Sequence, residues 1–150
     1  MVYLSLTYNF NLIVRPHPYL TKQFPDIAAQ LANISQLNNV HIDKEYNYYG
    51  MFKLADFIVS DISSLAYEFL VTTKPVILTT TTLKTDLLFK DYIDSQVMYN
   101  AKNQNELETR IKLLLGHFDE FKNRRVAFVN DNPRNPTKLI VDYIKKEFNK

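Results

Sequence analysis

The chain has 150 residues, of which 46% are hydrophobic and 23% are charged, so it is long enough to bury one core and is not composed like a disordered segment. A net charge of +2 gives no reason to expect nucleic acid as a partner, and the absence of cysteine excludes disulfides, thiolate metal sites and cysteine nucleophiles. Because the chain has only two glycines, it has no glycine-rich phosphate loop, and any phosphate has to be bound by side chains and helix ends.

The first predicted element is a short strand near the N-terminus. The apolar stretch of residues 1–14 is interrupted by polar side chains, lacks a basic leader and falls short of the about 20 residues that a membrane span needs, so we expect neither a signal peptide nor an anchor. Within it, residues 11–14 form an apolar run that Pro16 and Pro18 follow. Because proline cannot sit inside a ladder of paired strands, this pattern predicts a buried strand that ends in a rigid turn.

Helical and extended segments then alternate as far as residue 78. Apolar residues recur at helical spacing in three segments, residues 19–33, 46–55 and 63–72. Short apolar runs predict three strands between them, at residues 40–43, 57–60 and 75–78. Such alternation is typical of parallel pairing, so we predict an α/β fold with a Rossmann-like open parallel sheet flanked by helices.

The pattern is weaker after Thr79. A threonine-rich loop and an unassigned stretch precede a further predicted strand at residues 96–99. Beyond it, the clearest helix spans residues 103–115, because Asn103 and Glu106 can form a capping box at its start.

Two more helices are predicted in the C-terminal part of the chain. One spans residues 119–129, and the other begins at Pro136 with Asn135 as its cap. Basic residues are mildly enriched after Lys122, and we interpret them as a solvated helix face rather than as a patch for a membrane or a polyanion.

A first polar cluster, Arg15-Pro16-His17-Pro18, follows the strand predicted at residues 11–14. In open parallel sheets, ligands bind outside the carboxyl ends of the strands, where helix N-termini present free N–H groups. The two prolines stiffen the backbone on both sides of His17, so little entropy is lost when the turn binds a ligand. Two interpretations are open: His17 is a turn histidine bonded to a neighbouring carbonyl, or it contacts an anion.

A second cluster, Ser60-Asp61-Ile62-Ser63-Ser64, stands between a predicted strand and a predicted helix. Its hydroxyl groups or the Asp61 carboxylate can simply cap the helix. In the functional interpretation, Asp61 organises the turn, and Ser63 and Ser64 donate hydrogen bonds to phosphate oxygens at the helix start.

The remaining polar residues carry weaker hypotheses. Two acidic pairs, Asp91 with Asp94 and Asp119 with Glu120, do not form a plausible metal site and are interpreted as surface charges. His41 and His117 have no partners at metal-ligand spacing and are interpreted as structural or exposed. Tyr46, Tyr48 and Tyr49 precede a helix and either stack on a base or simply pack. Glu68 lies one helical turn past Ser64, where it either reaches a ribose hydroxyl or occupies an exposed helix position.

Three motifs together carry a resemblance to a known family. They are Arg15-Pro16-His17-Pro18, residues 54–69 and Lys74-Pro75-Val76-Ile77. In this order and spacing they resemble the C-terminal domain of the CDP-glycerol glycerophosphotransferases, which polymerise wall teichoic acids and related capsule polymers. The similarity runs from about Asn11 to Leu78, and more loosely to Phe148.

The resemblance implies a GT-B fold, in which two Rossmann-like domains face each other and the C-terminal one holds the nucleotide donor. We therefore expect residues 1–150 to form a single nucleotide-donor-binding domain. The family's domain opens with one more strand before the helix that residues 1–8 resemble, and that strand and the N-terminal acceptor domain are expected to be missing. The isolated chain is expected to be inactive.

The resemblance also implies roles for particular residues. His17 would be the catalytic residue that contacts the donor pyrophosphate and stabilises the leaving nucleotide, and Arg15, Asp61, Ser63 and Ser64 would complete the pyrophosphate site. Charge growing on the leaving phosphate can be neutralised by an arginine, a protonated histidine and a helix N-terminus, with no metal and no cofactor required.

The implied partners are a CDP-activated polyol phosphate and a polymer acceptor bound through the missing domain. The implied location is the cytoplasm, with peripheral association at the inner face of the membrane. Two alternatives remain open: a GT-B capsule glycosyltransferase domain that uses a nucleotide sugar, and a catalytically silent, truncated binding module.

Overall fold

The computed structural model describes residues 1–17, 19–61, 63–79 and 90–131. The chain divides into two compact units, Met1–Ala55 and Asp56–Lys150, and each is described by itself. The threonine-rich loop after Thr79 and the helix expected from Pro136, with its cap Asn135, lie outside the described residues.

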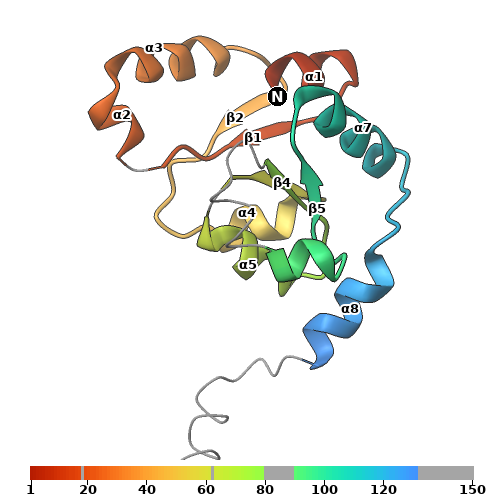
Figure 1. Cartoon of the computed structure of the whole chain (residues 1–150). Helices are drawn as coiled ribbons and strands as arrows, with labels where there is room; N and C mark the ends of the chain where they lie inside the picture. The colour runs from red at the N-terminus through yellow and green to blue at the C-terminus, as the bar shows by residue number, and fades with distance from the viewer. Residues whose placement is uncertain (18, 62, 80–89, 132–150) are drawn as a thin grey trace, which may run out of the picture. The chain divides into compact units, whose positions relative to one another are not determined.

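The first unit is a β–α–β arrangement (Figure 1). Its elements are α1 (Val2–Thr7), β1 (Leu12–Val14), α2 (Leu20–Gln23), α3 (Pro25–Ile34), β2 (Val40–Ile42) and α4 (Tyr49–Leu54). The strands β1 and β2 pair in parallel, with Leu12 opposite Val40. The apolar side chains of Leu4 and Phe52 are buried with those two residues and form the core of the unit.

The single helix expected at residues 19–33 is two helices, so this prediction was wrong. Phe24 has an extended backbone, with φ −131° and ψ 87°, and Pro25 opens α3 at its first position. Proline fits the first turn of a helix but removes a hydrogen bond and clashes in the interior, so the chain has to start a new helix here.

The second unit is built on a three-stranded sheet of order β3-β4-β5. Its elements are β3 (Ile58–Ser60), α5 (Ser64–Leu70), β4 (Val76–Thr79), β5 (Tyr99–Ala101), α7 (Gln104–Leu115) and α8 (Lys122–Asp131), and residues 90–94 are also helical. All pairs are parallel, with Ile58 opposite Val76 and Ile77 opposite Tyr99. The helix α5 packs against β3 and β4, and α7 packs against β4 and β5 (Figure 1).

The expected fold class is confirmed, because both units contain parallel strands flanked by helices. The central strand β4 has a fully buried apolar run, with Val76, Ile77 and Leu78 each 0% exposed, as a strand covered on both faces requires. None of the described helices is long and apolar enough to span a membrane.

The last strand is displaced from its prediction. A strand was expected at residues 96–99, but β5 begins at Tyr99. Gln96 has a φ of 56°, in the left-handed region, so it belongs to the turn before the strand. Val97 and Met98 are buried without being part of β5, which is why the apolar pattern suggested a strand there.

The predicted N-cap of α7 is confirmed, but the Glu106 side chain bonds the backbone N–H of Lys102 and not that of Asn103, which a capping box requires. Asn103 Oδ1 accepts a hydrogen bond from Glu106 N at 2.9 Å, and Glu106 Oε2 accepts one from Lys102 N at 2.9 Å. The basic stretch after Lys122 only partly fits the expected solvated face: Arg124 is exposed, whereas Arg125 is buried in the unit.

Candidate functional site

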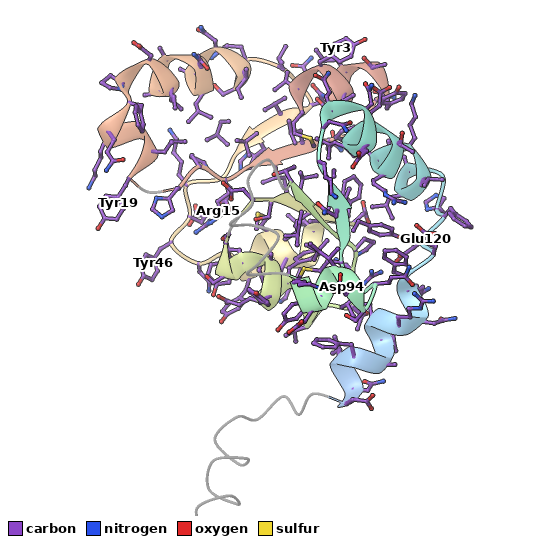
Figure 2. The ribbon with its side chains drawn as sticks, viewed as in Figure 1. Tyr3, Arg15, Tyr19, Tyr46, Asp94 and Glu120 are labelled. Atoms are coloured by element: carbon purple, nitrogen blue, oxygen red, sulfur yellow. The ribbon has the colours of Figure 1, made fainter. Side chains whose placement is uncertain are left out.

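Arg15 follows β1 directly and forms an ion pair with Asp43, which follows β2. Arg15 Nη1 donates to Asp43 Oδ2 at 2.7 Å, and Nη2 donates to the Tyr46 carbonyl at 3.4 Å. The guanidinium carbon lies 5.6 Å from the centroid of the Tyr48 ring. Figure 2 shows Arg15 at the end of β1, with the ring of Tyr46 pointing away into solvent. Arg15 is therefore largely occupied by partners within its own unit.

Asp43 holds its charge although its side chain is only 8% exposed. Burial raises the pKa of the Asp43 carboxyl, but the Glu45 N–H donor and the Arg15 guanidinium together outweigh burial, and the pKa ends below its ordinary value. Asp43 Oδ1 accepts from Glu45 N at 3.0 Å, and Asp43 N donates to the Val14 carbonyl at 2.9 Å. Asp43 thus joins the carboxyl ends of β1 and β2.

His17 is exposed and bonded to the backbone that follows it. Its Nδ1 accepts a hydrogen bond from Tyr19 N at 3.3 Å, and its carbonyl accepts one from Leu20 N at 2.9 Å. His17 is thus a turn histidine, as one of the two interpretations held, but its ring accepts a hydrogen bond from a backbone N–H and does not bond a carbonyl. The neutral tautomer that fits this hydrogen bond carries its proton on Nε2, and no described residue bonds Nε2.

Ser63 is the N-cap of α5. Its Oγ accepts from Leu65 N at 3.2 Å, so the capping interpretation of this cluster is confirmed for Ser63. A hydroxyl that accepts one bond still has a hydrogen to donate. Ser64 is exposed at the first helical position, and Glu68 is half-buried one turn further on. The exposed Asp61 carboxylate has no hydrogen bond among the described residues that would show it organising the turn.

The predicted site residues fall into both units. Arg15 and His17 belong to the first unit, and Asp61, Ser63, Ser64 and Glu68 to the second. In each unit the residues lie just beyond the carboxyl end of a parallel strand, where the general rule for α/β sheets places ligands.

The other candidates are placed as follows. His41 and His117 are exposed, as expected. Tyr46 is 100% exposed, whereas Tyr48 packs with its ring centroid 5.1 Å from that of Phe52. In the part of the chain that the structure describes, no three His, Asp or Glu side chains are grouped to hold a metal ion.

A buried network around Asp119 was not predicted from the sequence. This residue was interpreted as a surface charge, and that was wrong: its Oδ1 accepts from the Tyr99 hydroxyl at 2.8 Å, and its Oδ2 pairs with Arg125. Arg125 is 0% exposed and also donates to the Thr73 carbonyl at 2.9 Å and the Val97 carbonyl at 3.3 Å. Burial, and next the bond to Asp119, raise the pKa of Tyr99 to about 12. One signal was present: Arg125 is four residues before the apolar Val129 and four after Phe121, on the apolar face of the helix.

Parallel β–α units whose strands end in polar turns define the described chain as a Rossmann-like α/β domain. The family described as CDP-Glycerol:Poly(glycerophosphate) glycerophosphotransferase matches residues 2–134. The chain belongs to this family and is a glycerophosphotransferase-type domain, as the motifs around His17 and Ser63 indicated. Searches of curated proteins and of solved structures give no significant match.

Proposed function

We propose that the chain is the donor-binding domain of a transferase that uses CDP-glycerol, or a similar CDP-activated polyol phosphate, to build a teichoic acid or capsule polymer. The observation that carries the proposal is the family match over residues 2–134, together with the exposed His17 whose Nε2 no described residue bonds. The proposed setting is a GT-B enzyme in which a second domain binds the acceptor.

The proposed reaction is displacement at phosphorus. An acceptor hydroxyl attacks the phosphorus atom that carries the glycerol, a new P–O bond forms, the bridging P–O bond of the pyrophosphate breaks, and CMP leaves with the bridging oxygen. Negative charge grows on the CMP phosphate, and donors aimed at that charge lower the barrier. Nε2–H of His17 is proposed as one such donor.

Ser63 and Ser64 are proposed as ligands of the donor phosphates. The Ser63 hydroxyl has a hydrogen to donate while its oxygen caps α5, and the exposed Ser64 stands at the first helical position. Arg15 contributes less than the sequence suggested, because Asp43 already neutralises much of its charge. Asp61 and Glu68 stay proposed contacts of the phosphates and the ribose.

Calorimetric titration of the chain with CDP, CMP and cytidine tests the proposal. His17→Ala should weaken CDP binding by about 10- to 150-fold, since a lost hydrogen bond to a charged group is worth about 1.5–3 kcal/mol, and it should leave cytidine binding unchanged. His41→Ala is the matched control, because His41 is an exposed histidine on β2 of the same unit. Equal losses for CDP and cytidine in His17→Ala would contradict the pyrophosphate role. Tight binding of a UDP-sugar without binding of CDP would favour the glycosyltransferase alternative.

A further inference from the structure

Asp43 is a buried charged group that the proposed chemistry does not use. Both of its carboxylate oxygens have partners, Arg15 Nη1 on one and Glu45 N on the other. Nothing in the sequence singled it out, because it is one acidic residue at the end of a short predicted strand. Its position follows from the register of the first sheet: Val14 pairs with Ile42, so the next residues along the two strands, Arg15 and Asp43, stand side by side.

The ion pair immobilises one side of the His17 turn. Only Pro16 separates Arg15 from His17, and Pro16 has a fixed φ. On the other side of His17, the N–H groups of Tyr19 and Leu20 donate to its ring and to its carbonyl. The imidazole is therefore held between a charged anchor before it and a pair of hydrogen bonds after it.

The energetics of such a pair favour a geometric role. Desolvation of a buried ion pair offsets much of its Coulomb attraction, so the net gain in stability is small, whereas the orientation that it imposes is specific. Two acceptors, Asp43 Oδ2 and the Tyr46 carbonyl, fix the direction of the Arg15 guanidinium group, and the Tyr48 ring packs against it. A lysine has a single ammonium group and cannot reproduce this arrangement.

We propose that Asp43 is a positioning residue: through Arg15 it fixes the turn after β1 so that His17 presents Nε2 to the pyrophosphate of the donor. This inference rests on the proposed function for its ligand, but the positioning itself concerns the chain alone. It assigns Arg15 mainly to the scaffold of the turn. If Arg15 were instead mainly a phosphate ligand, removal of the Asp43 charge would free its guanidinium and tighten the binding of CDP.

The test compares Asp43→Asn with the full-length wild-type chain. Nitrogen-15 NMR of the imidazole reports which ring nitrogen carries the proton, and hydrogen exchange reports the protection of the Tyr19 and Leu20 N–H groups. In Asp43→Asn we expect the preference of His17 for the Nε2–H form to weaken and the protection of the Tyr19 and Leu20 N–H groups to fall at least tenfold. The dissociation constant of CDP should rise about tenfold, and that of cytidine should stay unchanged. The matched control is Asp26→Asn, an exposed acidic residue on α3, which should change none of these quantities.

Arg15→Lys is the second variant in case Asp43→Asn does not fold, and it should loosen the turn in the same way while the positive charge is kept. An unchanged imidazole tautomer and unchanged protection in a folded variant would overturn the proposal, and so would tighter binding of CDP. If the wild type bound no CDP while Asp43→Asn still lowered the protection of the Tyr19 and Leu20 N–H groups, the proposed function would fail and the positioning role of Asp43 would stand.

Discussion

Replacing Arg125 by alanine should destabilise the second unit strongly, because no other charged residue that the structure describes in this unit is fully buried. The guanidinium is fully buried and donates to three acceptors, the Asp119 carboxylate and the carbonyls of Thr73 and Val97. The Thr73 carbonyl belongs to a residue with φ 61°, a conformation that β-branched residues rarely adopt, so Arg125 supports a strained turn.

The magnitude follows from what the substitution leaves behind. Removing one partner of a buried ion pair costs about 3–5 kcal/mol, because the other charge and its hydrogen-bonding neighbours lose their partner. Water can still reach the Asp119 side chain, which is 17% exposed, so we expect the lower end, about 3 kcal/mol. Against a typical unfolding free energy of about 5–15 kcal/mol this is a large fraction, and it lowers the melting temperature by roughly 6–12 °C in a chain of this length.

Urea unfolding followed by circular dichroism measures the loss, and hydrogen exchange locates it. Exchange should rise in residues 90–131 and stay unchanged in residues 1–55, because the hydrogen-bond acceptors of Arg125 among the described residues all lie in the second unit. Arg124→Ala is the control: its side chain is exposed, so its effect should stay within about 0.5 kcal/mol. A difference of less than about 1 kcal/mol between the two variants would refute the reasoning that the buried network stabilises the unit.

Two further predictions concern the same unit. The fold raises the pKa of Tyr99 from 10.0 to about 12. The stability that the neutral hydroxyl contributes is fully present below pH 10, and about 3 kcal/mol of it is lost as the pH rises toward 12. The urea midpoint of Tyr99→Phe should fall less than that of the wild type over this window, and equal falls would contradict the raised pKa of Tyr99. Asn103→Ala removes the N-cap of α7 and should lower the unfolding free energy by about 1 kcal/mol, seen as a decrease of about 2–4 °C in the melting temperature, whereas Asn105→Ala inside the same helix should not.

The sequence predicted those parts of the fold that depend on neighbouring residues. The cap of α7 involves residues three apart, Asn103 and Glu106, so its pattern is visible along the chain. The strands β1 to β4 were found within one or two residues because each is a short apolar run next to a proline or a polar turn. The break at Pro25 was also visible in principle, since a proline inside a helical pattern marks a helix start.

The two buried ion pairs could not be predicted in this way. Arg125 donates to a carbonyl that is 52 positions away in sequence, and Arg15 finds Asp43 at a separation of 28. A charged residue on a helix or in a loop is normally solvated, so composition alone assigns it to the surface. The register of β1 and β2 brings Arg15 beside Asp43, and the packing of α8 brings Arg125 to its acceptors.

The two ion pairs lie at opposite ends of the strands of their own sheets, and this difference predicts different consequences. Arg15 and Asp43 follow β1 and β2, at the carboxyl ends where ligands bind in parallel sheets, whereas Arg125 bonds Thr73 and Val97, which precede β4 and β5. A change at the carboxyl ends moves groups of the proposed donor site, but a change at the amino ends moves only the packing that holds the sheet. Asp43→Asn should therefore lower the affinity for CDP and cost less stability than Arg125→Ala, because water can reach the Arg15 side chain, which is 20% exposed. Arg125→Ala should cost more stability and leave the affinity for CDP unchanged in the molecules that remain folded. This contrast would support a donor site at the carboxyl ends of the strands, because a general loosening of the fold would lower both the affinity for CDP and the stability in both variants.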